Sequence, residues 1–153
     1  MISDFTTTAK TSGPIGILMP IEVHFDDLDA LGMLHNGRYQ VLVERAWLSF
    51  WHRKGFFGAE GLENDGFNVV KTFTITYDTP VTAFGTYAVN LWIEKIGTTS
   101  VTCGYRVCSA DGEKTYAYGI RTAICLDRKT LLPTPWSDHA REVAATIMAT
   151  QAS

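Results

Sequence analysis

One long helical segment dominates the expected architecture, because its apolar residues cover more than one side. Between residues 37 and 54, apolar side chains recur at steps of three and four, the spacing of one face of an α-helix. Val41, Leu48 and Trp51 widen this surface beyond a single stripe. A helix that is apolar on more than one side is usually surrounded by other elements, so this one needs a partner that wraps around it. The residues of the main face are Tyr39, Leu42, Val43, Ala46, Trp47 and Phe50.

The segments after the helix supply that partner as strands. They alternate apolar and polar residues and are separated by short turns, which is typical of an antiparallel meander. An earlier extended segment, residues 15–25, contains Pro20 and is expected at a sheet edge or strand start. The economical packing wraps one antiparallel sheet around the helix. The strands expected after the helix span residues 67–77, 86–96, 100–110 and 114–128, and a short terminal helix capped by Ser137 is expected over 137–149.

The length of 153 residues favours a single domain, expected over residues 15–153. Residues 1–14 are rich in Thr, Ser and Gly and are predicted to form a flexible N-terminal arm. The net charge of −3, with mixed signs along the chain, argues against nucleic acid as the main partner. We find no signal peptide, and no apolar run approaches the ~18 residues of a membrane span.

Cysteine usage bears on the cellular compartment. The 3 cysteines are an odd number and lack a CxxC pair, which favours buried thiols in a reducing environment. Together with the absence of targeting segments, this predicts a cytoplasmic protein without a membrane partner.

Ionisable residues are concentrated just before the helix, in the stretch VHFDDLDALGMLHNG (23–37). The helix is expected to begin near Asn36 and Gly37, where free backbone N–H groups and the helix dipole favour an oxyanion or a polarised carbonyl. Asp29 precedes Asn36 by one short loop, which Gly32 allows to turn sharply. A carboxylate beside such amides offers a base or nucleophile next to an oxyanion hole, as acyl transfer requires. Alternatively, Asp29 only caps the loop and stabilises the fold by roughly 1 kcal/mol.

The run DLDALGMLHNGRY (27–39) resembles the D-x-D-x-x-G-x-x-x-x-x-x-Y signature of hotdog-fold thioesterases, the 4-hydroxybenzoyl-CoA thioesterase-like family with its acyl-CoA and acyl-carrier-protein relatives. The similarity covers roughly residues 18–135 and includes the runs ITYDTP and IGTTS. The resemblance implies an α+β hotdog fold, in which a five-stranded antiparallel sheet curls around one long helix. It also implies a homodimer with active sites at the subunit interface, or a dimer of dimers (a homotetramer).

The resemblance implies hydrolysis of an acyl-CoA or acyl-carrier-protein thioester, without a cofactor or metal. Asp29 is then the catalytic carboxylate, which either attacks the thioester carbonyl or activates water. The amide that polarises the carbonyl maps near Asn36 and Gly37. His35 and Asn36 are candidates for holding the water.

Substrate contacts are expected along the helix, because the acyl chain lies along it in this fold. The turn at Thr98-Thr99 lacks the basic residue that relatives often carry near the phosphates of coenzyme A. The nucleotide is therefore held differently here, or the carrier is a protein-bound phosphopantetheine arm. Arg121, Arg128 and Lys129 are candidate phosphate contacts, although solvated surface positions are the favoured interpretation. The candidate substrate-binding residues are Tyr39, Leu42, Val43, Trp47 and Arg121.

Other interpretations of these residues remain open. On the same fold, Asp29 and His35 would serve as the acid–base pair of an acyl-thioester hydratase or dehydratase. A non-catalytic module that binds acyl thioesters is a further alternative, since a fold does not guarantee chemistry. Asp27 is expected to be structural, and Glu44 to pair with its neighbour Arg45. A metal site at His24, Asp26, Asp29 and His35 is disfavoured, because paired HxH or HxxxH spacing is missing.

Overall fold

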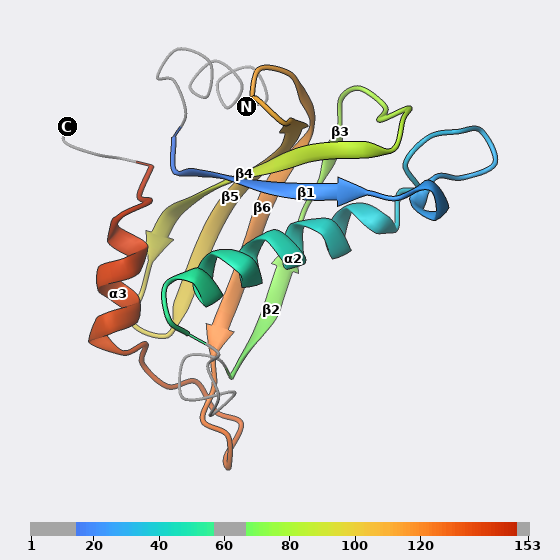
Figure 1. Cartoon of the computed structure of the whole chain (residues 1–153). Helices are drawn as coiled ribbons and strands as arrows, with labels where there is room; N and C mark the ends of the chain where they lie inside the picture. Colours follow the sequence, from blue (N-terminus) through green and yellow to red (C-terminus); the bar gives the residue numbers. More distant parts are fainter. Residues whose placement is uncertain (1–14, 57–66, 150–153) are drawn as a thin grey trace.

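The computed structural model describes residues 15–56 and 67–149 (Figure 1). The arm expected at 1–14 lies outside the described residues. In chain order the elements are β1 (Ile17–Val23), the short 3-10 helix η1 (Phe25–Asp27), α2 (Arg38–Arg53), β2 (Asn68–Phe73), β3 (Thr76–Tyr77), β4 (Gly85–Ile96), β5 (Ser100–Ser109), β6 (Thr115–Cys125) and α3 (Asp138–Ala145).

The strands form one antiparallel sheet in the order β1-β4-β5-β6-β2, and the two-residue strand β3 also pairs with β6. Figure 1 shows α2 lying across one face of this curved sheet, while α3 stands beside one end of it. The predicted α+β fold, a sheet curled around one long helix, is therefore confirmed, but the sheet has 6 strands and not the five expected, because β2 and β3 are separate strands. Among the described helices, none is both long enough and apolar enough to cross a membrane.

The strand predicted over 67–77 is interrupted, because the backbone near Thr74 crosses very close to β6. Thr74 N–H donates to the Ile120 carbonyl at 2.9 Å, and the Tyr105 hydroxyl donates to the Thr74 carbonyl at 2.8 Å. A Cβ on Gly119 would lie 1.9 Å from that same carbonyl oxygen, so a side chain there cannot be accommodated without a backbone shift. The register between β2 and β6 also shifts at Lys71, which interrupts the apolar alternation in the sequence.

The helix α2 buries the face that its sequence predicts, from Tyr39 to Phe50. The additional apolar residues Val41 and Leu48 are instead 37% and 48% exposed, so one chain covers only one side of the helix.

At the start of α3, the Ser137 hydroxyl accepts a hydrogen bond from Ala140 N–H at 3.0 Å, which confirms the predicted cap. Helix α3 ends before residue 149, because residues 147–149 exchange backbone hydrogen bonds with Ile93 of β4.

Candidate functional site

The Asp29 side chain closes its own turn and keeps one oxygen available. Its Oδ1 accepts hydrogen bonds from the backbone N–H groups of Leu31 at 2.8 Å and Met33 at 3.1 Å. Gly32 adopts a φ of 79° inside this turn, a conformation that favours glycine. Within the described residues, Oδ2 accepts no hydrogen bond. The two interpretations of Asp29 are thus compatible, because one oxygen stabilises the loop while the other is available to react.

Asp27 is buried and holds the loop against the helix. Its carboxylate accepts the backbone N–H of His24 at 2.7 Å and lies 3.4 Å from the Arg38 guanidinium. Its carbonyl accepts the N–H of His35 at 3.0 Å. These contacts connect the end of β1, the loop and the first turn of α2, as expected for a structural residue.

The first backbone amides of the helix are not equally available. Gly37, the residue before α2, donates its N–H to Nδ1 of His35 at 2.9 Å. This hydrogen bond places the imidazole proton on Nε2 when His35 is neutral. The Asn36 N–H, by contrast, has no partner in the described parts of the chain. Of these two amides, the Asn36 N–H is therefore the one left available to a further acceptor.

Asp29 and Asn36 line the same surface hollow, which has a volume of about 430 Å³ and is completed by residues 77–80 and Tyr39. The Tyr77 hydroxyl donates to the Asn36 carbonyl at 3.4 Å, and the rings of Tyr77 and Tyr39 meet edge to face at 5.0 Å. Burial raises the pKa of Tyr39, and the neighbouring Tyr77 and Tyr87 add to that shift. The sequence pattern does not predict this place of Tyr77 in the hollow, although the residue begins the YDTP segment of the quoted motif.

The other predicted substrate contacts separate into two groups. Leu42 and Val43 are 2% and 0% exposed and belong to the hydrophobic core. Trp47 and Arg121 line a second, larger cavity farther along α2. A solvated position for Arg121 is wrong, since the residue is 3% exposed on the side of β6 that faces the helix.

Glu44 pairs with Arg121 of β6, and the expected pairing with Arg45 is wrong. The guanidinium donates from Nε to Oε2 at 2.5 Å and from Nη2 to Oε1 at 2.9 Å. Adjacent helix residues point in different directions, so Glu44 and Arg45 do not face each other. Arg121 also stacks over the Trp47 ring at 5.2 Å, which fixes the ion pair against the helix.

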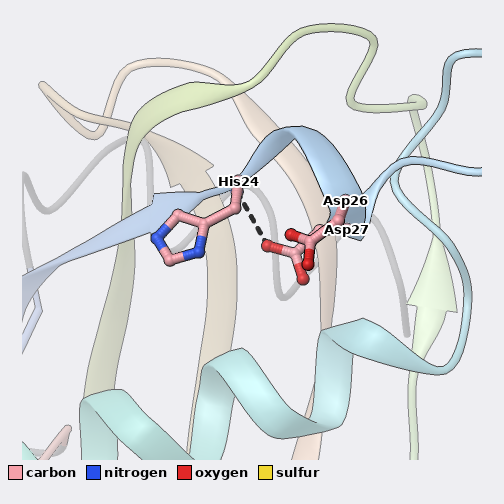
Figure 2. Close-up of side chains that lie close together, drawn as sticks. All are labelled: His24, Asp26 and Asp27. Carbon is pink, nitrogen blue, oxygen red and sulfur yellow. Dashed lines mark hydrogen bonds between the residues drawn. The ribbon is translucent and has the colours of Figure 1, made fainter.

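Residues considered for a metal are only partly brought together. Figure 2 shows His24, Asp26 and Asp27 side by side, and their potential ligand atoms lie within 4.8 Å of one another. Asp29 and His35 do not belong to this cluster. The Asp27 carboxylate already serves His24 N–H and Arg38. One of the three potential ligand groups is therefore already engaged in structural contacts.

The turn at Thr98-Thr99 has no basic residue of its own, yet one approaches it from α3. Arg141 donates from Nη2 to the Gly97 carbonyl at 2.7 Å and to the Thr98 carbonyl at 3.4 Å. The sequence does not predict this contact, because more than forty residues separate Arg141 from the two carbonyl groups.

The fold and the loop–helix site together define a hotdog-fold protein, and comparisons with known proteins agree. The PA5185 protein of Pseudomonas aeruginosa is 18% identical, with a TM-score of 0.80 over 90% of this chain and 94% of that one. A Thermus thermophilus thioesterase complexed with coenzyme A and Zn is 20% identical, with a TM-score of 0.73 over 90% and 98%. The DHNA-CoA thioesterase of Staphylococcus aureus is 22% identical, with a TM-score of 0.72 over 85% and 89%. These similarities establish the fold.

The family follows from the sequence itself. Residues 23–144 match the family model of the thioesterase-like superfamily, so the chain belongs to that superfamily. No curated protein shows significant similarity to the sequence. Membership supports thioester hydrolysis as the general activity.

Proposed function

We propose that this protein hydrolyses an acyl thioester at the hollow shared by Asp29 and Asn36. The observation that supports the proposal is the pairing of two unused groups, Oδ2 of Asp29 and the N–H of Asn36, on one surface depression. A carboxylate and a peptide N–H are the two groups that thioester cleavage needs.

Two routes are compatible with this geometry. In the first, Asp29 Oδ2 takes a proton from water, and the hydroxide attacks the thioester carbonyl carbon. The Asn36 N–H stabilises the resulting oxyanion, which collapses to the free acid as the thiolate leaves and is protonated. In the second, Oδ2 itself attacks and expels the thiolate, and water then hydrolyses the mixed anhydride. The Leu31 and Met33 amides hold the carboxylate in position on both routes.

His35 acts in this proposal as a positioning residue. Its Nδ1 engages the Gly37 N–H, so the imidazole holds the backbone in the conformation that leaves the Asn36 N–H available. An exchange of roles, with the Gly37 amide as carbonyl donor, would require the His35 ring to rotate away.

Coenzyme A is the first carrier to test. The Thermus neighbour is complexed with coenzyme A, and the Staphylococcus neighbour is named for a CoA thioester. An acyl-carrier-protein thioester is the second carrier. Cys103, Cys108 and Cys125 are buried and form no disulfide, which is compatible with a reducing compartment such as the cytoplasm.

We also propose that the active unit is a homodimer, either alone or paired into a tetramer. The strand β2 forms one edge of the sheet, and its Val69 and Val70 are 47% and 38% exposed. Val41 and Leu48 of α2 are also exposed. An apolar strand edge of this kind favours pairing with a second chain.

The decisive experiment replaces Asp29 by Asn and measures thiol release from a panel of short, long, branched and aromatic acyl-CoAs. The amide oxygen of Asn still accepts the turn hydrogen bonds, so the loop keeps its shape while the base is lost. We expect kcat to fall by about 10²–10⁴-fold. Asp26→Asn, an exposed carboxylate of the same loop outside the hollow, serves as the matched control and keeps wild-type activity.

Asp29→Ala is a less informative variant, because it also removes the acceptor of two backbone N–H groups. Its activity loss includes a loss of stability on the order of 1 kcal/mol. Undiminished hydrolysis by folded Asp29→Asn protein contradicts the catalytic assignment. Conversion of enoyl-CoA to its hydrated product would instead support the hydratase alternative, and tight binding without turnover would support a binding module.

A further inference from the structure

The larger cavity, which we call the α2–α3 cavity, has a volume of about 720 Å³. It lies between the second half of α2, the strands β2 and β6, and α3, and its lining residues are distinct from those of the Asp29 hollow. Its size falls within the roughly 300–1,000 Å³ of small-molecule sites. Its lining includes the aromatic side chains of Trp47, Trp51, Phe56 and Trp136 beside smaller apolar and polar residues.

Two buried hydrogen-bond donors in this wall lack acceptors. Glu44 occupies Nε and Nη2 of Arg121, but Nη1 is buried and has no partner among the described residues. The indole N–H of Trp136 is likewise buried without a partner there. Arg121 is 3% exposed and Trp136 is 9% exposed, so bulk water does not satisfy either group. Buried hydrogen-bond donors of native proteins are almost always paired. We therefore expect a bound group to supply a hydrogen-bond acceptor at this wall.

The charge of the wall restricts what that acceptor is. The Glu44 carboxylate lines the same cavity and neutralises Arg121, so a second carboxylate would be placed next to an existing one. Both unused groups are donors, and neither accepts a hydrogen bond. The complementary group is therefore an uncharged oxygen, such as a ketone, ether or hydroxyl oxygen, carried on an apolar body.

We propose that the α2–α3 cavity binds an apolar group bearing an uncharged oxygen acceptor, and that this group is the distal part of the acyl chain. The second half of the statement rests on the proposed thioesterase function. Asn36 precedes α2 and Glu44 lies on it, about 12 Å farther along at the standard helical rise. An acyl chain held by its carbonyl at Asn36 and following α2 thus reaches the cavity with its far end.

The binding test compares two probes of nearly identical shape, 2-acetonaphthone and 2-ethylnaphthalene, which differ by one ketone oxygen. Quenching of tryptophan fluorescence reports binding, because Trp47, Trp51 and Trp136 line the cavity. We expect the ketone to bind about tenfold more tightly, the change that one well-placed hydrogen bond contributes. Equal affinity for the two probes would overturn the proposal.

Variants of tryptophan test where the preference for the ketone arises, and they leave the Glu44–Arg121 ion pair intact. Trp136→Phe removes one unpaired N–H while keeping an aromatic ring, and we expect it to reduce the preference for the ketone. Trp92→Phe is the matched control, because the Trp92 indole donates to Glu94 at 2.6 Å and does not line the cavity. A preference that is unchanged in Trp136→Phe, or reduced equally in Trp92→Phe, would count against the site.

The assignment to the acyl chain has its own readout. We expect the ketone to inhibit hydrolysis of decanoyl-CoA competitively, raising KM and leaving kcat unchanged. Unchanged KM at saturating ketone would overturn the assignment of the cavity to the acyl chain. A wild-type protein without any hydrolase activity would contradict the proposed function, and the fluorescence titration would still decide whether the cavity binds the probe.

Discussion

At the scale of single residues, burial dominates the acid–base behaviour of two thiols. It raises the pKa of Cys103 from 9.0 to about 12 and that of Cys108 to about 11, although Arg121 and Arg106 respectively oppose the shift. Because the folded pKa values exceed the unfolded ones, the unfolded chain loses these protons first as pH rises. The stabilisation is complete below pH 9.0 and is lost toward pH 11 and 12. We expect the free energy of unfolding to fall across this window, by up to about 1.4 kcal/mol per pH unit and thiol.

Urea denaturation at several pH values measures this decline, and Cys103→Ala should reduce its slope. Thiol labelling provides an independent check near pH 9. The folded chain should react slowly with a disulfide reagent, while the urea-unfolded chain reacts at once with all 3 cysteines. Labelling of the folded protein at the unfolded rate would show that these thiols are accessible.

The sequence pattern is enough to expect Asp29 and Asn36 near each other, but it does not specify the contacts around them. The loop length and Gly32 are local features, so they were enough to expect Asp29 near Asn36. Which amide remains free depends on the His35 side chain, which the sequence pattern does not specify. The partner of Glu44 lies on another element, 77 residues away, and only the packing of β6 against α2 brings the two together.

At the scale of elements, periodicity predicted α2 and most strands to within a few residues, because each buries one face against the core. Periodicity does not reveal the break between β2 and β3, because the break depends on a contact between distant backbones. Gly119 permits that contact, and Thr74 and Tyr105 fix it by hydrogen bonds. The break also places Tyr77 beside Asn36, so this irregularity shapes the candidate site.

Gly119→Ala tests this role of the crossing. The added methyl group would meet the Thr74 carbonyl oxygen at 1.9 Å, and a backbone shift must relieve the clash. We expect a loss of at least about 1–3 kcal/mol in unfolding free energy, the usual range for overpacking, and reduced thiol release. Gly97→Ala is the control, because its methyl group would approach the Ser100 hydroxyl at 3.0 Å, which can rotate away, and backbone atoms only at an ordinary contact distance of 3.6 Å or more. Equal stability of the two variants would contradict the interpretation.

At the scale of the whole molecule, one chain leaves part of its central helix uncovered. The sequence pattern predicted a helix surrounded on more than one side, whereas α2 packs against its own sheet and exposes Val41 and Leu48. These two residues are seven positions apart and lie on the same side of the helix. The sequence pattern and the structure agree if a second chain covers this side of α2, as in the proposed dimer.

Leu48→Lys tests the proposed dimer directly. Lysine is a good helix former, and position 48 is 48% exposed, so the single chain should fold with little loss. A charge in an apolar contact with a second chain is costly, so we expect the variant to dissociate at concentrations where the wild type stays dimeric. Light scattering during gel filtration measures the mass. Glu142→Lys, an 80% exposed charge change on α3, should leave it unchanged. A wild-type monomer, or a Leu48→Lys dimer as stable as the wild type, would show that this side of α2 is not the subunit interface.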